Sequence, residues 1–252
     1  MSCATPWRNA AYPTSSRPGL RARPFSCPLR GTLLVSTGVK RGADWWLWIS
    51  SLAFVLLSAA AGLRLLYPLD RLVLRASQSR PSEVLDAAGV LFSVPGGAEY
   101  SGAAVLALAA GLVFTGRRTL AGRLLLAFVL TALLELALKT WLPTVPMPSA
   151  AARSADPSFI IEVTYPFPYP SGHMLRSVIL LGAVYLLWPN RLLRAAIVVA
   201  LLGVAASRVY IGVHWPSDVI GGILLGIAGL AWAFKRETSG YRYQQEKPKP
   251  DA

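Results

Sequence analysis

The sequence predicts an all-α protein, a polytopic bundle of six transmembrane helices with an extracytoplasmic active site. Hydrophobic residues make up 54% of the 252 residues and charged residues only 15%, which is too apolar for an ordinary soluble domain. The apolar residues are gathered into six runs along the chain. The ionisable residues next to these runs concentrate at the ends of four of them.

Each predicted span is one apolar run. A helix that crosses a bilayer needs about 20 largely apolar residues, so the longer runs span alone and the shorter ones borrow residues from their flanks. Together the runs define a membrane domain over residues 44–236. In chain order they are Trp45–Leu66, Tyr100–Thr115, Leu120–Leu142, Met174–Trp188, Leu192–Ser207 and Pro216–Phe234.

A tail precedes the first span and another follows the last. Residues 1–43 hold seven Lys or Arg and no acidic residue, so we expect a basic, disordered tail. It lacks the apolar core of a cleavable signal peptide. An over-extended translation start and an organellar transit segment are the alternatives to a native tail. Cys3 and Cys27 both lie in this tail and say little about redox compartment. Residues 237–252 form a polar C-terminal tail.

The distribution of Lys and Arg predicts the orientation in the membrane. Short cytoplasmic loops are enriched in these residues. With six spans, the basic residues of both tails fall on one side, together with those between spans two and three and between spans four and five. We therefore expect a multi-pass protein of the cell membrane with both termini in the cytoplasm. The net charge of +13 then reflects topology, and no nucleic-acid partner is expected because the basic residues are not gathered on one face.

Four predicted span ends on the outer face carry ionisable residues. These residues are Lys139 at the end of the third span, His173 at the start of the fourth, Arg208 at the end of the fifth, and His214 with Asp218 at the start of the sixth. Ionisable residues at membrane depth are costly and usually functional. His173 and His214 are the only histidines of the chain, and imidazole can exchange protons near neutral pH or act as a nucleophile. This convergence predicts a pocket for phosphate-ester chemistry at the membrane surface.

The local sequence around these residues predicts their geometry. Ser171 and Gly172 come just before the fourth span, so their N–H groups should lie at a helix N-terminus, which favours an anion. Pro216 suits the first turn of the sixth span, where its missing N–H costs nothing. Asp218 lies one helical turn after His214 and can accept its ring N–H. The other ring nitrogen is then left to attack.

A structural explanation competes for each residue taken alone. Asp218 suits a first-turn acid, Arg208 a side chain that snorkels from a helix end, and Lys139 an anchor paired with Glu135 one turn earlier. Independent caps and anchors have no reason to reproduce a spacing pattern with two histidines, which favours the functional interpretation.

At these residues the chain resembles the type 2 phosphatidic acid phosphatase family, membrane relatives of vanadium-dependent haloperoxidases and bacterial acid phosphatases. Pro170–His173 matches the family's second motif, Pro-Ser-Gly-His, in full. Ser207–Asp218 matches the third, in which Ser-Arg, His and Asp are separated by five and three residues. The first motif, Lys and six residues before Arg-Pro, is matched in part, because Pro146 and Met147 follow Lys139 where Arg-Pro would stand.

The resemblance covers roughly residues 45–235 and implies a two-step phosphoryl transfer that needs neither metal nor cofactor. His214 would attack phosphorus to form a phosphohistidine, and His173 would protonate the leaving oxygen. Asp218 would orient His214. The residues implied to hold the phosphoryl oxygens are Lys139, Arg208, Ser171 and Gly172.

The incomplete first motif lacks one arginine that would clamp phosphate. Two other arginines are candidate substitutes. Arg153 lies in the same outer loop, and Arg176 lies one turn into the fourth span on the side of His173.

We therefore expect an integral membrane phosphatase whose partners are the bilayer and a lipid phosphate or pyrophosphate. Candidate substrates are undecaprenyl pyrophosphate, phosphatidic acid and a phosphatidylglycerol phosphate. One alternative is a lipid phosphotransferase of the same fold. A second is a non-catalytic lipid-binding or transport protein, suggested by the incomplete motif, although transporters usually carry their polar residues at the bilayer midplane rather than at span ends.

Overall fold

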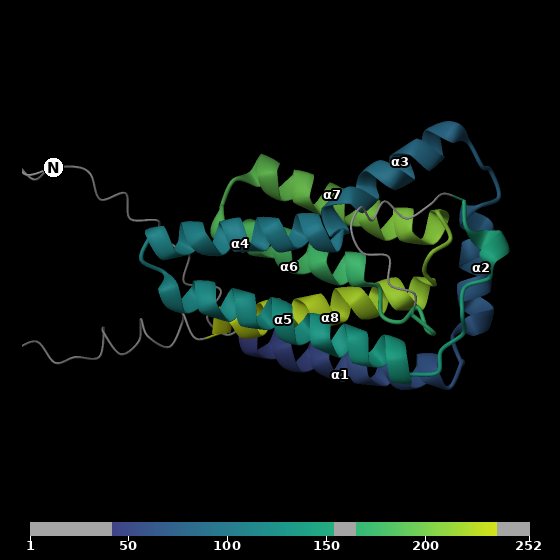
Figure 1. The fold of residues 1–252 in the computed structure, drawn as a ribbon, viewed down its shortest axis with the longest axis horizontal. Coiled ribbons are helices and arrows are strands. Elements are labelled where there is room, and N and C mark those ends of the chain that lie inside the picture. The colour runs from purple at the N-terminus through teal and green to yellow at the C-terminus, as the bar shows by residue number, and fades with distance from the viewer. Residues whose placement is uncertain (1–41, 154–164, 236–252) are drawn as a thin grey trace, which may run out of the picture. The chain divides into compact units, whose positions relative to one another are not determined.

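The computed structural model describes residues 42–153 and 165–235, and every regular element in these ranges is helical (Figure 1). The predicted tails lie outside the described residues, apart from Gly42 and Ala43. These two residues belong to the first helix, so that helix begins two residues before the predicted domain boundary.

A helix forms in each of the six predicted apolar runs. Four of them, α1, α5, α7 and α8, are long and apolar enough to cross a membrane alone. Helix α4 qualifies only together with α3, at a bend of 44°, and α6 has 16 residues. The described residues thus hold four or five candidate spans by length and composition, and the count of six stays a prediction. The six helices are α1 (Gly42–Gly62), α4 (Ala98–Phe114), α5 (Arg118–Trp141), α6 (Gly172–Leu187), α7 (Arg191–Tyr210) and α8 (Pro216–Lys235).

Two further helices lie between α1 and α4, where we predicted no element. Helix α2 (Tyr67–Ser77) has Pro68 in its first turn, and α3 (Glu83–Ser93) is capped by Ser82, whose hydroxyl accepts the Leu85 N–H at 3.2 Å. A search for long apolar runs misses such short helices with charged residues. Two 3-10 turns complete the described elements, η2 (Val94–Gly96) and η3 (Ser149–Ala151).

Helix α8 packs against α1, α6 and α5 (Figure 1). Its contact with α6 depends on glycine, because a Cβ on Gly226 would lie 2.8 Å from the Cβ of Val178. Small residues let helix backbones approach closely within membranes. A backbone hydrogen bond joins the starts of the two helices, from the Ser171 N–H to the Asp218 carbonyl at 2.9 Å. The second and third sequence motifs are thereby joined.

Large apolar side chains cover the outward faces of the long helices. Leu192 is 81% exposed, Trp45 69% and Leu202 65%. Monomeric soluble proteins rarely expose contiguous apolar surface on this scale. This surface fits a protein whose helices face lipid.

Candidate active site

The structure places the predicted ionisable residues at neighbouring helix ends, and all of them are buried. Lys139 lies in the last turn of α5, His173 in the first turn of α6 and Arg208 in the last turn of α7. His214 lies in the α7–α8 connection, and Asp218 in the first turn of α8. The charges of Lys139, Arg208 and His173 all act on the His214 imidazole.

The His214 ring lies against the Asp218 carboxylate. Nδ1 of His214 is 3.4 Å from Oδ2 of Asp218, and the same oxygen accepts the Trp215 N–H at 2.9 Å. The backbone bond fixes the carboxylate independently of the imidazole. A proton on Nδ1 is stabilised by this carboxylate, so the tautomer with a free lone pair on Nε2 is favoured. Nε2 is the nitrogen that can attack.

A tight turn explains the spacing between Arg208 and His214. Gly212 has a φ of +74°, a backbone conformation that residues other than glycine rarely adopt. The turn brings the N–H groups of Val213 and His214 back to the Arg208 carbonyl, each at 3.3 Å. The arginine and the histidine of the third motif are therefore held by one backbone unit.

Burial and positive charge keep His214 neutral. Its pKa lies well below the ordinary value of 6.5, first because the ring is desolvated and second because of the nearby positive side chains, including Arg176. An unprotonated imidazole is the form that can donate a lone pair. The environment thus favours the neutral imidazole of His214 at neutral pH.

The second motif presents a hydroxyl to this site rather than the Ser171 N–H. That N–H, which we expected at an anion-binding helix end, donates to the Asp218 carbonyl instead. The Ser171 hydroxyl is fully buried, and within the described residues it has no hydrogen-bond partner. Buried polar groups are rarely left unpaired, so this hydroxyl is suited to bind a ligand atom. Gly172 is the first residue of α6.

The predicted ion pair between Lys139 and Glu135 is present, and Arg176 joins it. Nζ of Lys139 lies 2.9 Å from one carboxylate oxygen of Glu135, and Nη1 of Arg176 lies 3.0 Å from the other. Lys139 also lies over the Tyr165 ring, 4.9 Å from its centre. One buried carboxylate therefore holds two cations from α5 and α6.

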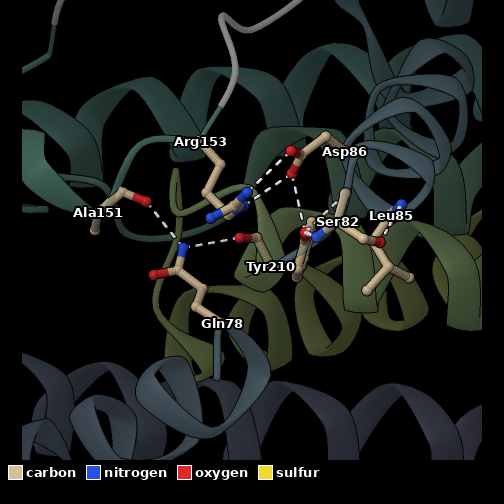
Figure 2. A network of polar contacts seen from close by, with 7 residues as sticks. All are labelled: Gln78, Ser82, Leu85, Asp86, Ala151, Arg153 and Tyr210. Carbon is tan, nitrogen blue, oxygen red and sulfur yellow. Dashed lines mark hydrogen bonds and ion pairs between the residues drawn. The ribbon is translucent and has the colours of Figure 1, made fainter. Parts of the chain in front are cut away.

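Arg153, the other candidate substitute, is engaged elsewhere. Its guanidinium binds both carboxylate oxygens of Asp86 at 2.8 and 2.9 Å and lies 5.3 Å from the centre of the Tyr210 ring (Figure 2). The Gln78 amide donates to the carbonyls of Ala151 and Tyr210 at 2.9 and 2.8 Å. This network ties the segment after α5 to α3 and the end of α7. No sequence pattern indicated it, because its members lie far apart in the chain.

Asp70 of α2 supports the site from outside the three motifs, and sequence reasoning missed it. Its buried carboxylate accepts the N–H of Ser217 at 2.9 Å and the hydroxyl of Ser217 at 2.7 Å. It therefore caps the start of α8, next to Asp218. Desolvation raises the pKa of Asp70, and the bonds from Ser217 oppose this shift. A lone acid between arginines carries no signal of such a role.

Replacing Asp70 with alanine should therefore loosen the start of α8. Two donors of Ser217 would lose their acceptor, at a cost of about 1–3 kcal/mol each if they stay buried. We expect a lower temperature of thermal unfolding in detergent. Glu83→Ala, which removes an exposed acid in the first turn of α3, is the matched control and should leave that temperature unchanged. Equal unfolding temperatures for the two variants would contradict the capping role.

Comparison with known proteins gives one family and several relatives. The PAP2 superfamily matches residues 102–239. The chain is 46% identical over 74 residues to an undecaprenyl-diphosphatase of Sulfolobus acidocaldarius, covering 28% of this chain and 34% of that protein. It is 43% identical over 70 residues to phosphatidylglycerophosphatase B of Escherichia coli, covering 27% and 28%. These matches span about a third of the relatives' length or less.

A solved structure shares the fold. It is the first transmembrane PAP2 type phosphatidylglycerolphosphate phosphatase from Bacillus subtilis, which aligns with a TM-score of 0.63 and 21% sequence identity. The alignment covers 81% of this chain and 100% of that structure. The likeness confirms the all-helical transmembrane fold.

Proposed function

This chain belongs to the PAP2 superfamily, and from that premise we propose that it is an integral membrane phosphatase that hydrolyses a lipid phosphate or diphosphate through a phosphohistidine. The observation that carries the proposal is the buried His214 imidazole, backed by Asp218 on one side and surrounded by positive side chains. A neutral nucleophile in a positive pocket suits attack on an anionic phosphorus centre.

In the first step, Nε2 of His214 attacks phosphorus and the bond to the leaving oxygen breaks. His173 gives its proton to that oxygen, and the Asp218 carboxylate stabilises the charge on the His214 ring. In the second step, water attacks the phosphohistidine while His173 takes a proton from it. Inorganic phosphate leaves, and both histidines return to their starting states.

The phosphoryl oxygens would be held by cations and hydrogen-bond donors around His214. Arg208 and Lys139 supply positive charge, the Ser171 hydroxyl supplies a buried donor, and the Gly172 N–H lies at the N-terminus of α6. Phosphoryl transfer depends mainly on such positioning and charge stabilisation.

A lipid substrate is supported by the position of the site at helix ends, where headgroups lie, and by the names of the relatives. We infer undecaprenyl diphosphate, phosphatidic acid or phosphatidylglycerol phosphate as substrate. The distribution of Lys and Arg supports a site on the extracytoplasmic face of the cell membrane with both termini in the cytoplasm.

Phosphate release by the purified protein in mixed lipid-detergent micelles tests this proposal. The three lipids and a soluble ester are compared, with a chelator present and with His214→Ala as the control. Release that persists with chelator and vanishes in the variant supports the phosphohistidine route. If a labelled phosphoryl group moves to another lipid instead of to water, the protein is a transferase.

The low pKa of His214 also predicts the pH dependence. Because the neutral imidazole is the form that attacks, the acid limb of kcat/KM should follow this lowered pKa and lie below pH 6.5. Nitrogen NMR on the His173→Ala variant, which retains one histidine, follows His214 alone. A His214 signal that titrates at or above pH 6.5 would contradict the prediction.

A further inference from the structure

The first motif of this chain lacks its arginine. Position 146, where the family places arginine, is proline. The carbonyl of the preceding residue, Val145, accepts the indole N–H of Trp215 at 2.8 Å, and Trp215 directly follows His214 in the chain. The backbone before position 146 therefore lies against the Trp215 side chain, and Pro146 itself carries no positive charge.

Arg176 brings a cation to the same site from α6. It lies three residues after His173, and residues three apart share one face of a helix. Its Nε donates to the Gly96 carbonyl at 3.0 Å. Gly96 packs directly on His173, because a Cβ there would lie 2.7–2.9 Å from the carbonyl oxygen, Cβ and Cα of His173. Arg176 is thus anchored next to the proposed acid.

Glu135 fixes the direction in which this arginine points. Its carboxylate binds Nη1 of Arg176 with one oxygen and Lys139 with the other, and a Cβ on Gly172 would collide with this carboxylate. The two cations therefore sit on either side of Glu135, next to the N-terminus of α6. Within residues 42–153 and 165–235, Nη2 of Arg176 makes no hydrogen bond, so it keeps donors for a ligand.

Arg153 is less available to bind a ligand, because its guanidinium is already engaged in an ion pair. Its guanidinium is held by both oxygens of Asp86, and its backbone N–H by the Ile211 carbonyl at 3.0 Å (Figure 2). To reach a phosphate, it would have to break a bidentate ion pair. Arg176 needs no such rearrangement.

We propose that Arg176 is a phosphate-binding residue that takes the place of the arginine missing from position 146, and that Glu135 is the positioning residue that holds it beside Lys139. This inference rests on the proposed phosphatase function, and it names a cation that the family motifs do not include. The guanidinium would bind the non-bridging oxygens of the phosphoryl group on the side of His173.

The test measures phosphate affinity separately from turnover. Inorganic phosphate is titrated against thermal unfolding of the full-length protein in detergent, and the same protein is assayed for phosphate release. We expect Arg176→Gln to raise the Kd for phosphate about tenfold or more, the loss that follows from removing one charged hydrogen bond. It should fold, because Glu135 keeps Lys139 as its partner. Adding Pro146→Arg to this variant should restore part of the affinity.

Two further variants make the result specific. Arg123→Gln removes another buried arginine, near the opposite end of α5 and 6.0 Å from the Trp232 ring, and should leave the Kd unchanged. The double variant Glu135→Gln with Arg176→Gln keeps the net charge of the site. If it binds phosphate more weakly than wild type, a change in net charge does not explain the loss.

The two proposals fail in different ways. Unchanged phosphate affinity in Arg176→Gln or in the double variant would overturn the role of Arg176, and so would a wild-type protein that binds no phosphate. If wild type binds phosphate but releases none from any lipid, the phosphatase function fails. In that case the effect of Arg176→Gln on the Kd for phosphate still tests whether Arg176 binds phosphate.

Discussion

His214→Ala is expected to lower phosphate release by a factor of about 10⁴ to 10⁶, because loss of a nucleophile leaves only the binding and charge contributions of the site. Nothing near His214 can replace it, since the only other histidine, His173, is assigned to the leaving group. The KM should change little, because Arg208 and Lys139 remain. The measurement is the steady-state rate with each lipid.

The His173→Ala variant tests whether His173 protonates the leaving group. A leaving group that is stable as an anion, such as nitrophenolate, needs no proton, so the loss of His173 should be much smaller with nitrophenyl phosphate than with a lipid phosphate. His214→Ala should be equally inactive with both. A His214→Ala variant that retains more than about a hundredth of wild-type activity would contradict the assignment, because general acid–base help alone contributes about 10²–10⁴.

Asp218→Asn is expected to lower kcat by about 10⁴, the size of effect seen when an orienting acid in a nucleophile–base–acid relay becomes an amide. The asparagine keeps the size of the side chain and can still accept the Trp215 N–H through its oxygen. Its neutral amide no longer stabilises charge on the His214 ring and can hold the wrong tautomer. The defect should therefore appear in kcat rather than in KM.

The unfolding temperature of the Asp218→Asn variant shows whether a loss of kcat comes from damage to the fold. Because Ser171 donates to the backbone carbonyl of residue 218 and Asp70 holds Ser217, the start of α8 keeps its anchors. Unfolding temperatures of variant and wild type should agree closely. A kcat within tenfold of wild type in a folded Asp218→Asn protein would show that Asp218 is structural only.

The long helices could be predicted because composition dictates them. Apolar runs of about 20 residues have few structural solutions in a membrane protein, and a helix lies in every predicted run. The short helices α2 and α3 could not be predicted this way, since their charged residues interrupt any apolar run. The buried capping role of Asp70 was missed for the same reason.

Contacts within one turn were predictable, whereas contacts between distant segments were not. The pairs His214–Asp218 and Glu135–Lys139 each lie four residues apart, a spacing that helices bring together. The second partner of Glu135, Arg176, comes from another helix, and the Arg153–Asp86 pair joins residues 67 positions apart. Neither has a local signature. Both depend on how the helices pack.

If His214 carries the phosphoryl group, the phosphorylated protein can be trapped during turnover. A lipid phosphate labelled at phosphorus is mixed with wild type, His173→Ala and His214→Ala, and the denatured proteins are analysed for bound label. Phosphohistidine is labile in acid and stable in alkali. We predict such label on wild type, more of it on His173→Ala, where hydrolysis of the intermediate is slowed, and none on His214→Ala. Label that persists on His214→Ala, or steady phosphate release by wild type with no trapped label under any quench, would show that His214 is not the nucleophile.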